Sequence, residues 1–316
     1  MKSQLFLLYV LCSFNLIKYI HCTCYGTFEL CTTTQDCVLD KSLCGKCSAN
    51  QYLCPDGKTC IMNVNDYQEK CPGLSNTHLD WTLSTEARVE YLISQLTVNE
   101  KIAQLTNNAP AIVRMGIPSY NWLNDDVHSV MQQHSTVFPD GCGLGATWSR
   151  TALLIVGQTV GIEARGTYNY NQHQGKRGQD GTNGLGISIY GPNMNLVRDP
   201  RWGRNQEVYS EDPYLSSQLT VHFVGGAQGK NFTDSKYKLV AACCKHYAAY
   251  DVETNRFEFD AQVNVRNMWE TYLPVFDACV NYGQVMSIMC SYNAINNIPT
   301  CGNPDLLNGI LRERWN

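Results

Sequence analysis

The chain has 316 residues, of which 44% are hydrophobic and 16% are charged. This composition is typical of globular proteins and excludes wholesale disorder or collagen-like structure. The formal net charge is −4 and the sequence has no long basic run, which argues against the phosphate backbone of nucleic acids as the main ligand. The length is enough for two ordinary domains or one large one.

The N-terminal segment, residues 1–22, predicts a secretory signal peptide. Lys2 supplies a positive charge, and an apolar run begins at Leu5. Asn15 and Lys18 interrupt this run before it reaches the ~20 apolar residues that span a bilayer. We therefore expect a mature chain that is secreted, either extracellular or lumenal, with a membrane anchor as the alternative.

Residues 23–72 are rich in cysteine. Eight cysteines fall in this segment: Cys24, Cys31, Cys37, Cys44, Cys47, Cys54, Cys60 and Cys71. In an oxidising compartment an even number of clustered cysteines predicts a disulfide-stapled module, although the sequence does not choose among the possible pairings. A zinc site at Cys44-Gly-Lys-Cys47 is the alternative, and it lacks a second CxxC at zinc-ribbon spacing. For a secreted chain, the sequon Asn231-Phe-Thr predicts a glycosylated surface loop.

Helix and strand patterns alternate in the remaining segment, residues 73–316. A capping box, Thr97-Val-Asn-Glu100, opens the first clear helix, and an extended stretch follows around residues 116–120. In chain order we then expect a strand at 136–138, a helix at 150–168, a strand at 186–196, a helix at 216–228, a strand at 239–244, a helix at 267–281, a strand at 285–290 and a helix at 304–315. Near-continuous apolar strands that alternate with helices predict a parallel sheet covered by helices.

This pattern favours a TIM-barrel-like (β/α)8 domain of which about five βα units are visible. A doubly wound open sheet is the alternative. No GxGxxG motif follows a strand, so a dinucleotide is not favoured. Later cysteines, at positions 142, 243, 244, 279, 290 and 301, either pair within the domain or remain buried thiols.

Polar residues gather directly after the predicted strands. The clusters are Asn124-Asp125-Asp126, Arg198-Asp199, Lys245-His246 and Tyr292-Asn293. Active sites of parallel barrels lie at the C-terminal ends of their strands, so these clusters indicate one site. Each also has a structural alternative, because aspartates cap helices and Asp199-Pro-Arg201-Trp-Gly-Arg204 can form an ion-pair network.

Together these residue types suit a sugar. A carboxylate accepts hydrogen bonds from hydroxyl protons, Lys, Arg and His donate to hydroxyl oxygens, and Trp or Tyr stacks on an apolar ring face. By this reasoning Trp122 and Trp202 are candidates for stacking.

Residues 118–315 resemble the N-terminal domain of glycoside hydrolase family 3, in particular its β-xylosidase and β-glucosidase members. The segments that carry the resemblance are Tyr-Asn-Trp-Leu-Asn-Asp-Asp-Val-His (120–128), Gly-Pro-Asn-Met-Asn-Leu-Val-Arg-Asp-Pro-Arg-Trp-Gly-Arg (191–204), Cys-Cys-Lys-His-Tyr-Ala-Ala-Tyr-Asp (243–251) and Met-Cys-Ser-Tyr-Asn (289–293). The resemblance implies that the substrate-binding residues are Asp125, Arg204, Lys245, His246 and Tyr292. Glu207 and Asp251 either support this site or form structural ion pairs.

The resemblance also implies retaining chemistry, which needs two carboxyl groups about 5–5.5 Å apart. In the family the nucleophilic aspartate lies on the strand after Met-Cys-Ser-Tyr-Asn, so we expect it beyond Asn316. The acid/base glutamate belongs to a second, C-terminal domain. We therefore expect the N-terminal portion of an exo-β-glycosidase, with a β-glycoside as substrate and no metal or organic cofactor. The alternatives are an inactive sugar-binding protein, or an unusual catalytic acid among Asp199, Glu211 and Asp260.

Overall fold

The computed structural model describes residues 77–315, except 81, 132–134, 174–185 and 230–237, together with four short strands nearer the N-terminus. The predicted signal peptide, the pairing of the eight clustered cysteines and the sequon at Asn231 lie outside the described residues. The chain divides into two compact units, one comprising residues 1–105 and 112–117 and the other residues 106–111 and 118–316.

Among its described residues, the first unit contains short antiparallel strand pairs and two helices. Strand β1 (Glu29–Leu30) pairs with β2 (Cys37–Val38), and β3 (Tyr52–Leu53) pairs with β4 (Cys60–Ile61). Helices α3 (Thr85–Gln95) and α4 (Val98–Ala103) precede a 3-10 turn, η3 (Val113–Met115). The predicted capping box is confirmed, because the Thr97 side chain accepts from the Glu100 N–H while the Glu100 carboxylate accepts from the Thr97 N–H.

A parallel sheet forms the centre of the second unit. Its strand order is β10 (Ser287–Cys290), β8 (Ala241–Tyr247) and β7 (Ser188–Ile189). Ser188 lies opposite Ala241, and Ser287 lies opposite Cys243. This arrangement confirms the predicted mixed α/β class. Within the described residues the parallel sheet has three strands, and a separate antiparallel pair joins β5 (Asn108–Ala109) to β6 (Tyr120–Asn121). The expectation of about five βα units in a TIM-barrel-like domain stays a prediction.

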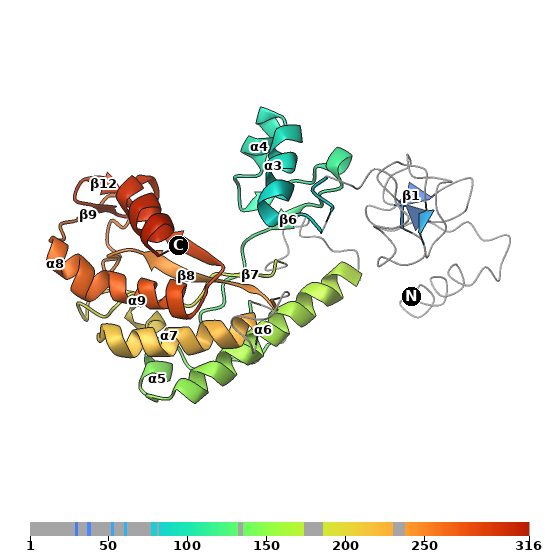
Figure 1. Ribbon diagram of the computed structural model, residues 1–316. Helices are drawn as coiled ribbons and strands as arrows, with labels where there is room; N and C mark the ends of the chain where they lie inside the picture. Colours follow the sequence, from blue (N-terminus) through green and yellow to red (C-terminus); the bar gives the residue numbers. More distant parts are fainter. Residues whose placement is uncertain are drawn as a thin grey trace. The chain divides into compact units, whose positions relative to one another are not determined.

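Helices pack against this sheet. The helices and helical turns of the second unit before β8 are α5 (Gly141–Gly145), α6 (Arg150–His173), η4 (Asn205–Glu207) and α7 (Pro213–Gln228). Helix α7 lies between α6 and α9 (Leu273–Asp277) (Figure 1). Among the residues that the structure describes, no helix combines the length and apolar character needed to cross a bilayer.

The C-terminal part of the second unit continues the alternation. Its remaining elements are β9 (Asp260–Ala261), α8 (Val265–Asn267), the π-helical turns η5 (Met268–Tyr272) and η6 (Ala278–Tyr282), β11 (Ala294–Ile295), β12 (Ile298–Pro299), the 3-10 turn η7 (Thr300–Gly302) and the π-helix η8 (Asp305–Arg314). Strand β11 pairs in parallel with β9 and antiparallel with β12. A disulfide joins Cys290 at the end of β10 to Cys301 in η7.

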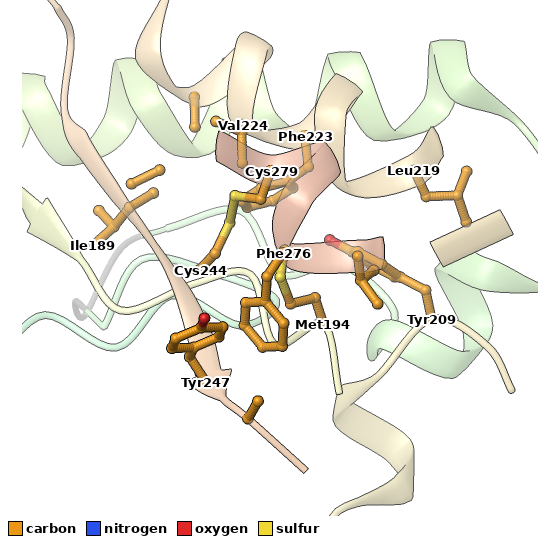
Figure 2. Packing of buried hydrophobic residues seen from close by; sticks show 14 of the residues in the cluster. Ile189, Met194, Tyr209, Leu219, Phe223, Val224, Cys244, Tyr247, Phe276 and Cys279 are labelled. Carbon is orange, nitrogen blue, oxygen red and sulfur yellow. A yellow bond between two sulfur atoms is a disulfide. The ribbon is translucent and has the colours of Figure 1, made fainter. Parts of the chain in front are cut away.

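The hydrophobic core lies between the sheet and its helices. Figure 2 shows the Cys244–Cys279 disulfide, which joins β8 to η6, surrounded by buried side chains of α7 and α9. Beside it the rings of Tyr247 and Phe276 meet edge to face, with centroids 5.0 Å apart. Of the remaining later cysteines, Cys142 and Cys243 are free thiols.

Two predicted strands differ from the structure. Residues 136–138 form no strand, because the Thr136 N–H and hydroxyl both donate to the Glu163 carboxylate, at 2.9 and 2.6 Å. The strand expected over 186–196 is limited to β7, because Pro192 has no N–H and the Asn193 side chain accepts from the Asn195 N–H at 3.1 Å.

Candidate functional site

The end of strand β8 carries two buried polar side chains, Lys245 and His246, which are 2% and 4% exposed. An ammonium group in this position needs a compensating charge. Lys245 Nζ donates to Asp125 Oδ1 at 2.9 Å, and the Asp125 side chain remains 46% exposed. The pair therefore joins a buried donor to a carboxylate that solvent and ligands can still reach.

Arg204 is held beside this pair by a second carboxylate. Its Nε and Nη2 donate to the two oxygens of Glu207 at 2.7 and 2.6 Å, which is a bidentate ion pair. Burial alone would raise the pKa of Glu207, but hydrogen bonds from Arg204 and Asn193 lower it overall. Arg204 Nη1 also lies 3.3 Å from His246 Nε2. The ion-pair interpretation of Glu207 agrees with these contacts, which also fix the position of Arg204 in the site.

The Tyr250 ring connects His246 to Tyr292. Its centroid lies 5.1 Å from that of His246 and 6.1 Å from that of Tyr292. Tyr292 is 49% exposed, and the guanidinium of Arg256 lies 4.7 Å from its ring centroid. Sequence reasoning missed Tyr250 and Arg256, although Tyr250 lies within the same motif as Lys245 and His246.

The structure thus brings together the five substrate-binding candidates. The contacts run from Asp125 to Lys245, from Arg204 to His246, and through Tyr250 to Tyr292. Burial, followed by the positive charges of nearby Lys and Arg side chains, lowers the pKa of His246 well below its ordinary value. The ring is therefore neutral at physiological pH.

The two neighbouring aspartates have different environments. Asp126 is fully buried, and neither of its carboxylate oxygens has a hydrogen-bond partner. Burial and the charge of Asp125 raise the pKa of Asp126 well above its ordinary value. Only Asp125 is therefore both exposed and paired with Lys245.

The two tryptophan candidates also differ. Trp122 is 46% exposed and meets Tyr120 edge to face, so its stacking role stays a prediction. Trp202 is only 4% exposed and packs with Val208 and Tyr250. The expectation that Trp202 stacks on a sugar is therefore corrected, because a buried indole has no free ring face.

The remaining acidic candidates make contacts of their own. Asp199 forms a bidentate pair with Arg201, whose hydrogen bonds lower the pKa of Asp199 to about 2. Asp260 accepts from the Asn297 N–H at 2.9 Å, and Glu211 is exposed. Asp251 accepts a hydrogen bond from the Tyr272 hydroxyl at 3.3 Å rather than forming an ion pair with a described residue. Within the described ranges no three His, Cys, Asp or Glu side chains are grouped to hold a metal ion.

Comparisons with known proteins agree on one family. The model of the glycosyl hydrolase family 3 N terminal domain matches residues 83–316. The chain is 40% identical over 248 residues to beta-D-xylosidase 3 of Arabidopsis thaliana, covering 74% of this chain and 30% of that protein. It is also 40% identical over 274 residues to a beta-xylosidase/alpha-L-arabinofuranosidase of Medicago sativa subsp. varia, covering 82% and 34%.

Solved structures give the same result. One is a GH3 exo-beta-xylosidase in complex with a xylobiose aziridine probe, with a TM-score of 0.66 and 29% identity over 76% of this chain and 31% of that chain. Another is a GH3 beta-glucosidase of Bifidobacterium adolescentis, with a TM-score of 0.59 and 31% identity over 71% and 30%. The chain spans about a third of the length of the curated relatives that it matches.

Proposed function

The chain belongs to glycosyl hydrolase family 3, and we propose that it is the N-terminal part of a secreted, retaining exo-β-glycosidase of the β-xylosidase or β-glucosidase type. The names of its relatives support the reaction class, since they include xylosidases and a glucosidase. In this proposal the chain contributes the pocket for the terminal sugar of a β-glycoside.

The observation that carries the proposal is the contact network from Asp125 through Lys245 and His246 to Tyr292. It combines a half-exposed acceptor with a buried ammonium donor 2.9 Å away and a half-exposed aromatic ring. Adjacent hydroxyls of a sugar offer both donors and acceptors, and the ring of the sugar offers an apolar face. Such a network matches a monosaccharide better than an apolar ligand.

Each side chain has a defined task in this proposal. Asp125 accepts from sugar hydroxyls, while Lys245 and the N–H groups of Arg204 that Glu207 does not use donate to hydroxyl oxygens. Hydrogen bonds to hydroxyls far from the reacting carbon hold the ring and help to distort it towards the oxocarbenium-like transition state. We propose that the nucleophile and the acid/base carboxyl lie in other parts of the full-length protein.

Hydrolysis of chromogenic β-xylosides and β-glucosides by the full-length protein tests the proposal. Arg204→Ala should lower kcat/KM by about 100-fold or more, because it removes a charged donor to the reacting sugar. Arg201→Ala is the matched control, since Arg201 lies in the same motif but is 89% exposed and paired with Asp199. Proton NMR of the first product should show the β-anomer. Equal loss in both variants, or inversion at the anomeric carbon, would contradict the proposed site or mechanism.

Calorimetry with xylose and glucose on the same preparation separates the enzyme from a sugar-binding protein. Sugar binding without release of the chromophore by a folded full-length protein would favour the binding protein. Absence of both binding and hydrolysis would exclude a sugar site.

The proposed secretion and processing have their own test. Expression in a eukaryotic secretory host, followed by mass spectrometry, should find a mature N-terminus near residue 23, a glycan on Asn231 and disulfides within residues 23–72. Retention of residues 1–22 in the secreted product would contradict the signal peptide.

A further inference from the structure

The side chain of Asn195 binds the main chain of His246 on both sides. Asn195 Nδ2 donates to the His246 carbonyl oxygen at 2.9 Å, and the His246 main-chain N–H donates to Asn195 Oδ1 at 3.0 Å. A main-chain carbonyl can only accept and a main-chain N–H can only donate. These two contacts therefore fix which amide atom is oxygen and which is nitrogen.

The orientation of the amide determines the tautomer of the imidazole. Asn195 Oδ1 also lies 3.0 Å from His246 Nδ1, and an amide oxygen can only accept. Nδ1 must therefore carry a proton. In a neutral ring the other nitrogen, Nε2, then has a lone pair and no proton, and it faces Arg204 Nη1 at 3.3 Å. Arginine has no acceptor, so Arg204 donates to Nε2.

Three positive charges near the imidazole favour the neutral ring. Lys245 precedes it on β8, Arg204 lies before η4, and Arg256 lies in the segment after β8. All three are cations, and the ring is buried with Tyr250 packed edge to face against it. Burial and these positive charges lower the pKa of His246, which agrees with the tautomer that the geometry requires.

We propose that Asn195 is a positioning residue that holds His246 as the neutral Nδ1–H tautomer, so that Nε2 acts as an acceptor and orients the guanidinium of Arg204. Glu207 fixes one edge of this guanidinium and His246 fixes Nη1. The expectation that His246 donates to a sugar hydroxyl is then excluded at Nε2, because this nitrogen carries no proton and its lone pair accepts from Arg204. The consequence for turnover rests on the proposed function, whereas the tautomer does not.

NMR of the full-length protein with 15N-labelled histidine tests the tautomer directly, because protonated and unprotonated ring nitrogens have well-separated shifts. The signals of His246 are assigned by their loss in His246→Gln. If that variant does not fold, they are assigned by their selective change in Asn195→Asp. We expect a protonated Nδ1, an unprotonated Nε2 and no titration between about pH 5 and 8. A proton on Nε2, or a cationic ring at neutral pH, would overturn the proposal.

Asn195→Asp tests the link to turnover. The carboxylate still accepts from both N–H groups of His246, but it no longer donates to the His246 carbonyl oxygen. It also adds a negative charge that favours the imidazolium and so removes the acceptor for Arg204. We expect kcat/KM to fall about 10-fold or more, with a larger loss at acidic pH and an upward shift of the His246 pKa in the NMR titration.

The matched control makes the same chemical change at a helix cap. Asn264 caps α8 by accepting from the Asn267 N–H, a task that aspartate performs equally well, so Asn264→Asp should keep the normal pH profile. An unchanged pH profile in Asn195→Asp would overturn the positioning role. If the wild-type protein cleaves no β-glycoside, the proposed function fails, while the NMR result still decides the tautomer.

Discussion

Asp251 supplies a quantitative test of how this fold treats a partly buried carboxyl group. The residue lies among Met194, Tyr250 and Tyr272. Burial raises its pKa from 3.8 to about 6, even though the hydrogen bond from Tyr272 and the positive charge of Arg198 oppose the shift. The carboxylate is therefore less stable in the folded chain than in the unfolded chain.

The sign of the effect on stability follows from proton binding. Between pH 3.8 and about 6 the folded chain keeps the Asp251 proton while the unfolded chain has lost it. The free energy of unfolding therefore falls as the pH rises through this window, by about 3 kcal/mol in total, and then stays level. Asp251→Asn removes this ionisation and retains an oxygen that can accept from Tyr272. The variant should match the wild type near pH 4 and exceed it by up to about 3 kcal/mol at pH 7.

Urea unfolding of both proteins at several pH values between 4 and 8 measures this difference. Asp305→Asn is the control, because Asp305 is exposed and its replacement should change stability by less than about 0.5 kcal/mol across the range. A constant difference between Asp251→Asn and the wild type at all pH values would refute the reasoning. So would a variant that is less stable at pH 7 than the wild type.

Two further pairs of substitutions test the packing and the ion pair in the second unit. A Cβ on Gly157 of α6 would lie 2.2 Å from the Phe223 carbonyl oxygen of α7, so Gly157→Ala should destabilise the fold by about 1–3 kcal/mol or more in urea unfolding. Gly166→Ala is the control on the same helix, because nothing lies within 4 Å of the added Cβ, and it should stabilise the protein by up to about 1 kcal/mol. Destabilisation by both substitutions would contradict the close contact between α6 and α7. Asp125→Asn leaves the ammonium of Lys245 buried without its anion and should lower the free energy of unfolding by about 1–3 kcal/mol. Lys245→Met removes the buried charge and should lower it less. The reverse order would show that the ion pair does not hold Lys245 in place.

Local signals in the sequence predicted the elements whose hydrogen bonds close within a few residues. Helix α4 follows from the Thr97–Glu100 capping box. Helix α7, expected from residue 216, begins at Pro213, because the Asp212 side chain caps it by accepting from the Tyr214 N–H. The apolar run before Lys245 gave β8 because a strand buried on both faces needs no polar alternation. The strand expected at 136–138 does not form because the Thr136 N–H donates to Glu163, which lies 27 residues later, and the Phe138 N–H donates to the His128 carbonyl oxygen.

The candidate site could likewise be predicted only in part. The motifs predicted which residues meet, since the ends of neighbouring strands lie along one edge of the sheet. They did not predict exposure, because segments distant in the sequence decide it. The local sequence does not distinguish Asp125 from Asp126, yet only Asp126 is fully buried. Trp202 likewise lies under Tyr250, whereas Trp122 remains half-exposed.

The balance of charge in the site constrains its ligand more than any single contact does. Each of the cations around His246 already has an anionic partner: Lys245 has Asp125, Arg204 has Glu207, and Arg256 has Glu253 at 2.9 Å. A phosphate or carboxylate ligand would need to compete with these carboxylates for the same N–H groups, and it would meet the charge of Asp125 at the exposed side of the site. A neutral ligand with many hydroxyl groups needs no such exchange, because it can donate to Asp125 and accept from the N–H groups that remain. The paired charges therefore support the proposed uncharged sugar over an anionic ligand.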